Sequence, residues 1–247
     1  MQFPSGTRHV SVVIPCLNEA EAIVAVVADV LAEGVDEVIV VDNGSTDETS
    51  ARATAAGARV VQQFERGYGR ACAAGLAAVD ASCEIVCFLD GDGSDVPSFM
   101  TAVVGPVAAG DADFVMGSRL RGTREAGSMT PQQLVAGWIA GHLMRVVYGV
   151  VYTDMSPFRA ATLDHLRALK MREMTYGWNL EMQMKVAAAG LRVLEIPVDH
   201  RCRRGGVSKV SGDFAQGIQA AWKITTTFLR LAASLKSTAR LSGQIHE

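Results

Sequence analysis

Apolar and polar positions alternate in blocks along the first half of the chain. Each block joins a short apolar run, typical of a strand buried on both faces, to a longer stretch whose apolar residues recur at helical spacing. Strand, helix and strand in this order predict a mostly parallel sheet with right-handed crossovers and helices on its faces. The predicted strands are Val10–Ile14, Glu37–Val41, Ala58–Val61, Ile85–Leu89 and Phe114–Met116.

The connecting segments carry helix start and stop signals. The apolar stripe of residues 23–31 has the spacing of an amphipathic helix and ends near Gly34. Short Ala-rich helices are expected after Asp47 and after the loop that contains Gly67. Ser94 or Asp95 is expected to cap a helix that has Pro97 at its start.

The second half of the chain is less regular. A loop from Ser118 to Pro131 is long enough to act as an active-site flap, and Thr153–Ala160 is expected to be irregular. The spacing predicts helices over residues 131–149 and 179–189, a short helix capped by Thr162, a strand at Arg192–Val198, and a helix within Asp213–Lys236. We therefore expect one α/β domain over residues 1–212 and an amphipathic helical extension over residues 213–247.

Composition sets limits on the class of protein. The chain has 247 residues, of which 49% are apolar and 20% charged, so it can build a core and is not a disordered chain. Its 23 basic and 26 acidic residues give a net charge of −3, which argues against a protein that coats nucleic acid. Many of its 24 glycines stand in polar clusters directly after apolar runs.

Location is predicted from the cysteines and from the apolar runs. Five cysteines without a C-x-x-C pair indicate reduced thiols and a cytoplasmic protein. The N-terminus lacks the apolar core of a signal peptide, and no stretch has the ~18 uninterrupted apolar residues of a membrane span. At most, we expect peripheral contact with the inner face of a membrane.

Polar turns follow three of the predicted strands, where ligands bind in open parallel sheets. Of these, Asp90-Gly91-Asp92 is the most informative, because two carboxylates flanking a glycine can reach one Mg²⁺ or Mn²⁺ ion that also binds phosphate. An ordinary capped turn is the alternative. A calcium loop is excluded, because Asp95 stands where glycine is needed and Thr101 where glutamate is needed.

Two basic, glycine-rich stretches could bind anions. The segment Arg66–Ala71 resembles a fragment of a dinucleotide motif, and a glycine-rich turn at a helix start is the simpler interpretation. A second stretch holds Arg201, Arg203, Arg204 and Lys209 around two glycines. It suits a phosphate-binding loop, and a solvated run of charge is equally consistent with it.

Together, several segments resemble the family-2 glycosyltransferases of the GT-A fold. They are VSVVIPCLNEAEAI, VVDNGSTDET, RGYGRA, the Asp-Gly-Asp after a strand, and GSRLRG. The later segments TDMSPFRA, YGWNLEMQMK and EIPVDHRCRRGGVSK are similar to the branch that contains dolichyl-phosphate mannose synthase and bacterial polyprenyl-phosphate sugar transferases. The resemblance covers residues 10–212. It departs at Asn43, where the family commonly has Asp, and at Gly91, where relatives often have Ala.

The resemblance implies roles for the residues that match its motifs. Asp90 and Asp92 would hold the metal, Arg119 would close over the donor from the flap, and Glu181 would lie near the acceptor. The residues that would bind the acceptor or its phosphate are Arg203, Ser208 and Lys209. The residues that would bind the nucleotide sugar are Pro15, Asn18, Glu19, Asp42, Gly44, Ser45, Gly67, Gly69, Arg70, Asp90, Gly91 and Arg119.

The expected reaction is the inverting transfer of a sugar from a UDP- or GDP-sugar to a polyprenyl or dolichyl phosphate. The alternative acceptor is a hydroxyl of a soluble small molecule, in which case Glu181 or Asp154 would remove the proton while Asp92 holds the metal. A nucleotidyltransferase and a non-catalytic module that binds nucleotide sugars are alternatives of other classes. No nucleic-acid partner is expected.

The C-terminal extension has its own alternatives. Its apolar stripe and its cations suit a membrane interface, and equally suit packing on its own domain or on a second subunit. The stripe consists of Phe214, Ile218, Ala221, Trp222, Thr225, Phe228, Leu229, and Leu231 or Ala232, and the cations are Lys223, Arg230 and Lys236.

Overall fold

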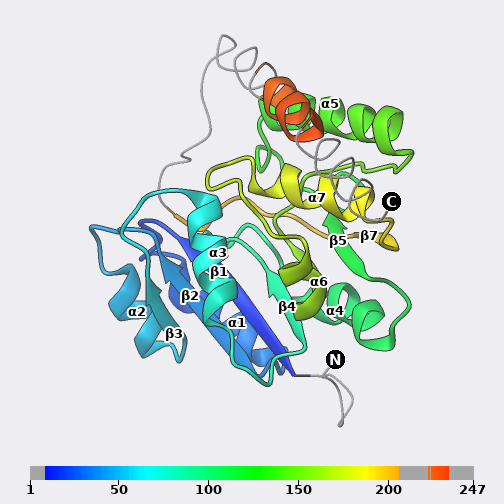
Figure 1. Cartoon of the computed structure of the whole chain (residues 1–247). Coiled ribbons are helices and arrows are strands. Elements are labelled where there is room, and N and C mark those ends of the chain that lie inside the picture. Colours follow the sequence, from blue (N-terminus) through cyan, green and yellow to red (C-terminus); the bar gives the residue numbers. More distant parts are fainter. Residues whose placement is uncertain (1–8, 206–221, 223, 234–247) are drawn as a thin grey trace.

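A computed structural model describes residues 9–205, 222 and 224–233 of the chain. A seven-stranded sheet with the order β3-β2-β1-β4-β6-β5-β7 forms its centre (Figure 1). The strands are β1 (Val10–Cys16), β2 (Glu37–Asp42), β3 (Arg59–Gln62), β4 (Ile85–Phe88), β5 (Phe114–Ser118), β6 (Arg159–Thr162) and β7 (Val193–Pro197). The predicted α/β class and the mostly parallel sheet are confirmed.

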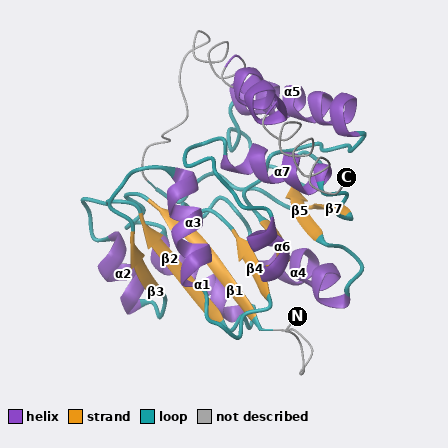
Figure 2. Ribbon diagram, viewed as in Figure 1, coloured by secondary structure: helices purple, strands orange, loops and turns teal. Residues whose placement is uncertain are grey.

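Helices cover both faces of the sheet, as the ribbon in Figure 2 shows. They are α1 (Ile23–Ala32), α2 (Thr49–Ala55), α3 (Tyr68–Ala78), the 3₁₀ turn η1 (Pro97–Phe99), α4 (Met100–Ala109), α5 (Pro131–Tyr148), α6 (Leu163–Ala168) and α7 (Trp178–Ala188). Within the described residues, no helix is long and apolar enough to cross a membrane.

Alternate residues of the strands point into two separate hydrophobic cores, one on each face of the sheet. Val12 and Ile14 of β1 pack with α1, α2 and α4 in one core, whereas Val13 packs with α3, α5, α6 and α7 in the other. A strand buried on both faces is therefore apolar at most positions, which explains the nearly continuous apolar runs that predicted β1, β2 and β4.

One strand was missed. Residues 159–160 were expected to be irregular, yet they begin β6, which lies antiparallel between β4 and β5. Its small residues Ala160 and Ala161 point into opposite cores. Two neighbouring strands therefore hold β6 in place, and its four residues carry no periodic signal of their own.

One predicted cap is also wrong. Pro97 does begin a helical turn, but that turn has no side-chain cap. The Asp95 carboxylate instead accepts a hydrogen bond from the backbone N–H of Asp90 (3.0 Å). By contrast, Thr162 caps α6, and Thr130 forms a capping box with Gln133 at the start of α5.

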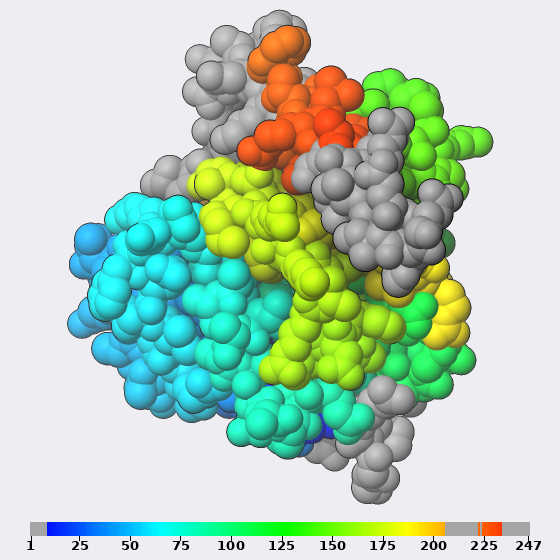
Figure 3. Space-filling model, viewed as in Figure 1, coloured from blue at the N-terminus to red at the C-terminus, as the bar shows by residue number. Residues whose placement is uncertain are grey.

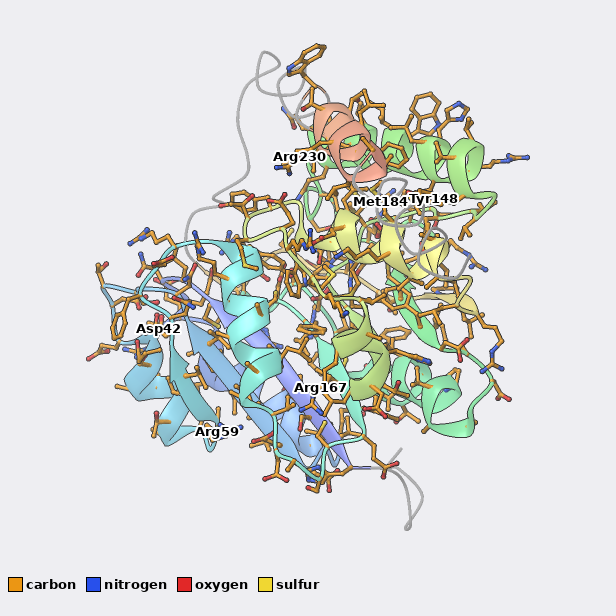
Figure 4. All side chains as sticks on the ribbon, viewed as in Figure 1. Asp42, Arg59, Tyr148, Arg167, Met184 and Arg230 are labelled. Atoms are coloured by element: carbon orange, nitrogen blue, oxygen red, sulfur yellow. The ribbon has the colours of Figure 1, made fainter. Side chains whose placement is uncertain are left out.

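Part of the C-terminal extension is described, namely Trp222 and residues 224–233, which are helical. We call residues 224–233 the C-terminal helix. Phe228 is 1% exposed and packs edge-to-face on Tyr148 of α5, with ring centroids 6.4 Å apart. Figure 4 labels Tyr148 beside this helix. This face of the helix therefore packs on its own domain, while the predicted boundary at residue 212 lies outside the described residues.

Candidate active site

The loops after β1 and β2 bind each other through side chains at the carboxyl edge of the sheet. Asp42 accepts hydrogen bonds from the backbone of Ser45 (2.7 Å) and from the Ser50 hydroxyl. Ser45 Oγ in turn accepts from the backbone N–H of Asn18 (2.9 Å), and Asn18 Oδ1 accepts from that of Thr46 (2.8 Å). Burial acts to raise the pKa of Asp42, but its serine hydrogen bonds outweigh this and lower it. The Asp42 carboxylate is therefore ionised and held in place.

Asn43 explains one departure from the family pattern. Its amide nitrogen donates to the carbonyls of Gln63 (3.0 Å) and Glu65 (2.8 Å), and its amide oxygen accepts from the backbone of Gly67 (2.7 Å). A carboxylate at this position could make only the last of these bonds. An asparagine is thus required to hold residues 63–67 beside the first two loops.

A group of three aspartates forms the centre of the site after β4. Burial, followed by the charges of Asp95 and Asp92, raises the pKa of Asp90 well above its ordinary value. Burial likewise raises the pKa of Asp95 to about 6. The donors to these acids are neutral groups: the Tyr68 hydroxyl donates to Asp90 Oδ1 (3.2 Å), and the backbone N–H of Ser94 donates to Asp92 Oδ1 (2.9 Å). This arrangement leaves negative charge that a cation would relieve.

The basic loop, residues 199–205, lies directly against this acidic group. The backbone N–H groups of Arg201 and Arg204 donate to the carbonyls of Ser94 and Asp92, both at 2.9 Å. His200, which the sequence did not single out, is 5% exposed, and its Nδ1 lies 3.8 Å from Asp95 Oδ1. Neither atom has a hydrogen-bond partner among the described residues, although both are buried.

Arg203 bridges two of the loops. Its guanidinium lies 3.0 Å from Glu19 and 3.8 Å from Asp92 Oδ2. The structure therefore brings Arg203 together with one nucleotide-binding candidate in the loop after β1, Glu19, and one metal candidate in the loop after β4, Asp92. Its predicted companions Ser208 and Lys209 lie outside the described residues.

Oxygen ligands at this site fit Mg²⁺ or Mn²⁺. Asp90 and Asp92 offer two carboxylates, and the buried Asp95 Oδ1 and His200 Nδ1 without partners mark a polar space beside them. In the part of the chain that the structure describes, no group of three or more His, Cys, Asp or Glu side chains could hold a metal by itself. An ion here would therefore complete its shell with phosphate oxygens and water, as Mg²⁺ sites commonly do.

Arg119, which was predicted to close over the donor, is buried and paired with another residue in this structure. Arg119 is 8% exposed, and its guanidinium forms a two-pronged ion pair with Asp154, with both bonds at 2.8 Å. Burial acts to lower the pKa of Arg119, but Asp154 outweighs it and the net shift is upward. Burial acts to raise the pKa of Asp154, and the bonds from Arg119 bring it below its ordinary value. In this structure Asp154 is thus the counter-ion of Arg119, and its carboxylate is not free to act as a base.

The carboxylate of Glu181 is likewise occupied by hydrogen bonds and an ion pair. Its carboxylate is 1% exposed, accepts hydrogen bonds from the backbone of Arg172 (2.9 Å) and Glu173 (2.7 Å), and pairs with Lys185 at 3.0 Å. The resemblance implies a place near the acceptor for this residue. The structure instead makes it the support of the turn before α7.

The anion site expected at the start of α3 is filled by protein. The backbone N–H groups of Gly69 and Arg70 donate to the carbonyls of Thr175 (3.2 Å) and Met174 (3.1 Å). A side chain at Gly67 or Gly69 would overlap backbone carbonyls of this same turn. The two glycines therefore allow the turn at 173–175 to approach, and Arg70 pairs with exposed Glu65 (3.2 Å).

Comparisons with known proteins define the class. Residues 11–169 match the model of glycosyl transferase family 2, and the chain belongs to this family. It is an enzyme, a glycosyltransferase. The finding also argues against the alternative that it is a nucleotidyltransferase.

Several individual members of the family and solved structures are similar to this chain. An uncharacterized glycosyltransferase of Mycobacterium tuberculosis is 37% identical over 219 residues, which cover 87% of this chain and 97% of that protein. Glycosyltransferase AglJ of Haloferax volcanii is 32% identical over 200 residues, 80% of this chain and 64% of that protein. The crystal structure of glucosyl-3-phosphoglycerate synthase from M. tuberculosis with Mn²⁺, UDP-glucose and phosphoglyceric acid is similar, with 25% identity and a TM-score of 0.69. The match covers 92% of this chain and 80% of that one.

Proposed function

We propose that this glycosyltransferase moves a sugar from a nucleoside-diphosphate sugar to a small soluble acceptor, with Mn²⁺ or Mg²⁺ bound at Asp90 and Asp92. The observation that carries the proposal is the group of three aspartates after β4, where burial raises the pKa of Asp90 and Asp95. It is supported by the similar structure that holds Mn²⁺, UDP-glucose and phosphoglyceric acid. When bound, the metal would neutralise charge on the departing nucleoside diphosphate.

The chain's own residues position the substrates. The interlocked loops that carry Asn18, Asp42 and Ser45 would hold the nucleoside, because they are prearranged by hydrogen bonds before any ligand arrives. Arg203 would exchange its contact with Glu19 for a phosphate oxygen, since a guanidinium binds phosphate in a forked geometry. The remaining donor-binding residues suggested by the sequence keep that role as predictions.

A soluble acceptor is better supported than polyprenyl phosphate. The solved relative is a glucosyl-3-phosphoglycerate synthase bound to phosphoglyceric acid. A polyprenyl phosphate, a cytoplasmic location and an oligomer through the C-terminal helices stay predictions. Inversion at the anomeric carbon also stays a prediction. The two expected bases, Asp154 and Glu181, are each held in an ion pair.

A donor and acceptor screen tests the proposal. Purified protein is incubated with UDP- and GDP-sugars, with Mn²⁺ or EDTA, and with either 3-phosphoglycerate, other small hydroxyl compounds, or a polyprenyl phosphate. We expect release of nucleoside diphosphate that requires the metal and a soluble acceptor, and NMR of the product reports its anomeric configuration. Asp92→Asn should abolish turnover, with Asp113→Asn, a surface aspartate, as the control. Release only with the lipid phosphate would reject the soluble acceptor, and release of pyrophosphate would reject glycosyl transfer.

A further inference from the structure

The outer face of α5 is apolar where a surface helix is normally polar. Val135, Trp138 and Val146 are 50%, 69% and 69% exposed, and they fall on one stripe with His142 and Arg145. Trp138 and His142 stack with ring centroids 5.8 Å apart. The opposite side of the helix is already used, since Ala136, Ala140 and Met144 lie in the core. The exposed stripe therefore has no packing role within the described part of the domain.

The C-terminal helix extends this apolar face. It lies beside α5 through the contact of Phe228 with Tyr148, at the end of the molecule away from the N-terminus (Figure 1). In the space-filling view of Figure 3, the orange-red atoms of this helix adjoin the green atoms of α5. While Phe228 points inward, Leu229 and the preceding Trp222 are 59% and 70% exposed. Two tryptophans from segments far apart in the sequence are thus exposed at the same end.

Charge is distributed unevenly along the sequence. Residues 126–153, which contain α5, and residues 214–246, which contain the C-terminal helix, have no Asp or Glu. Together these two segments carry five cations, Arg145, Lys223, Arg230, Lys236 and Arg240, so the remaining sequence holds 18 of the 23 cations and all 26 acids. Among the described residues, Arg145 lies on the exposed stripe of α5, whereas Arg230 is paired with Glu173. Because residues 126–153 contain no acid, the α5 stripe is apolar and carries positive charge.

We propose that this face, Val135, Trp138, His142, Arg145 and Val146 of α5 together with Trp222 and Leu229, docks on an anionic lipid surface. Tryptophan rings suit the boundary between headgroups and acyl chains, and the arginine would meet anionic headgroups. A second copy of the same face fits less well, because it would bring like charges together and offer no acid to pair with them. This inference goes beyond the proposed function, since transfer to a soluble acceptor needs no membrane.

Vesicle co-sedimentation of the full chain tests the proposal. Wild-type protein should bind vesicles of phosphatidylglycerol and phosphatidylcholine, bind pure phosphatidylcholine much more weakly, and dissociate as salt is raised. Trp138→Ser should weaken binding about tenfold, because burial of a large apolar side chain is lost. Arg145→Gln should weaken it roughly fivefold, as one cation near the surface contributes. Val24→Ser, which changes a 45% exposed valine on α1, is the matched control and should bind as wild type does.

The outcomes distinguish docking on lipid from misfolding and from self-association. Circular dichroism and release of nucleoside diphosphate in solution check that each variant is folded. Absence of binding to anionic vesicles by folded wild type would overturn the proposal, as would equal binding by Trp138→Ser. A dimer that Trp138→Ser converts to a monomer, without vesicle binding by either protein, would assign the face to a second copy instead.

Discussion

Gly91 stands between the two candidate metal ligands because Cys16 occupies the space that a side chain would need. A Cβ atom at this position would overlap Cys16 Sγ and lie 3.3 Å from Ile14 Cγ2. Cys16 and Ile14 belong to β1, which pairs with β4 immediately before the acidic loop. Glycine is therefore needed at position 91 because the Cys16 side chain leaves no room for a Cβ atom. This also explains why the chain departs here from relatives that have alanine.

Gly91→Ala should displace the Asp90–Asp92 loop and lower Mn²⁺ affinity and kcat/KM by about tenfold or more, since misplacement near 1 Å is costly. Cys16→Ala in the same protein removes the overlapping sulfur and should restore part of both values. Calorimetric titration with Mn²⁺ and steady-state kinetics measure them. Gly105→Ala on α4, where a Cβ meets nothing within 4 Å, is the control. Equal affinity in Gly91→Ala and wild type would contradict the role given to Cys16.

At the scale of elements, the turn at residues 172–175 joins three parts of the molecule. Glu181 of α7 holds its backbone from one side, and its carbonyls close the first turn of α3 on the other. Glu173 also pairs with Arg230, which Figure 4 labels on the C-terminal helix. Since α3 begins at Tyr68, whose hydroxyl reaches Asp90, the turn helps to aim one donor at the candidate metal site.

Glu181→Gln should therefore behave as the loss of a support and not of a base. We expect a lower Tm, a kcat reduced less than about tenfold, and an unchanged acid limb in the pH profile of kcat/KM. Loss of a general base would cost about 10²–10⁴-fold and remove that limb. Profiles between about pH 5.5 and 9 distinguish the two, with Glu48→Gln on the exposed pair with Arg52 as the control. A lost acid limb would reinstate Glu181 as the base.

For the molecule as a whole, enclosing the ionised carboxylates of Asp90 and Asp95 at one strand end costs stability unless a metal is bound. The pKa of Asp95 rises from 3.8 to about 6 in the folded protein. Its ionised form is therefore penalised above pH 6, and the penalty disappears below pH 3.8, where the carboxyl is protonated in both states. Stability without metal should thus gain from protonation of this group as the pH falls.

Asp95→Asn should stabilise the metal-free protein at about pH 8 by on the order of 1–3 kcal/mol, because the charge is removed while the amide oxygen still accepts from Asp90. The gain should shrink between about pH 6 and pH 4. Denaturant unfolding in EDTA at these pH values measures it. Asp113→Asn should change stability little and in the opposite direction, since its pKa is lowered to about 2 by Arg192 at the surface. A gain for Asp95→Asn that is independent of pH would show that charge is not its cause.

Sequence reasoning succeeded where the signal is local. The apolar runs of β1, β2 and β4, the Pro97 start and the Thr162 cap depend on neighbours a few residues away, and the structure has each of them. Sequence reasoning missed β6 because its four residues are held by two partner strands and need no apolar periodicity of their own. Sequence reasoning also missed His200, because a single histidine before a basic run does not indicate its contact with Asp95, 105 positions earlier in the sequence.

The sequence by itself determined the order of elements, the two-sided burial of the sheet and the position of Asp90-Gly91-Asp92 at a strand end. These follow from periodicity and turn chemistry along the chain. Only the tertiary structure decided which charged groups are free to act. In the folded chain Asp154 pairs with Arg119, and Glu181 binds the backbone of the turn before α7. Arg203 lies between Glu19 and Asp92. The state of a buried charge is set by its partners and by its separation from water, and chain folding alone brings those partners together.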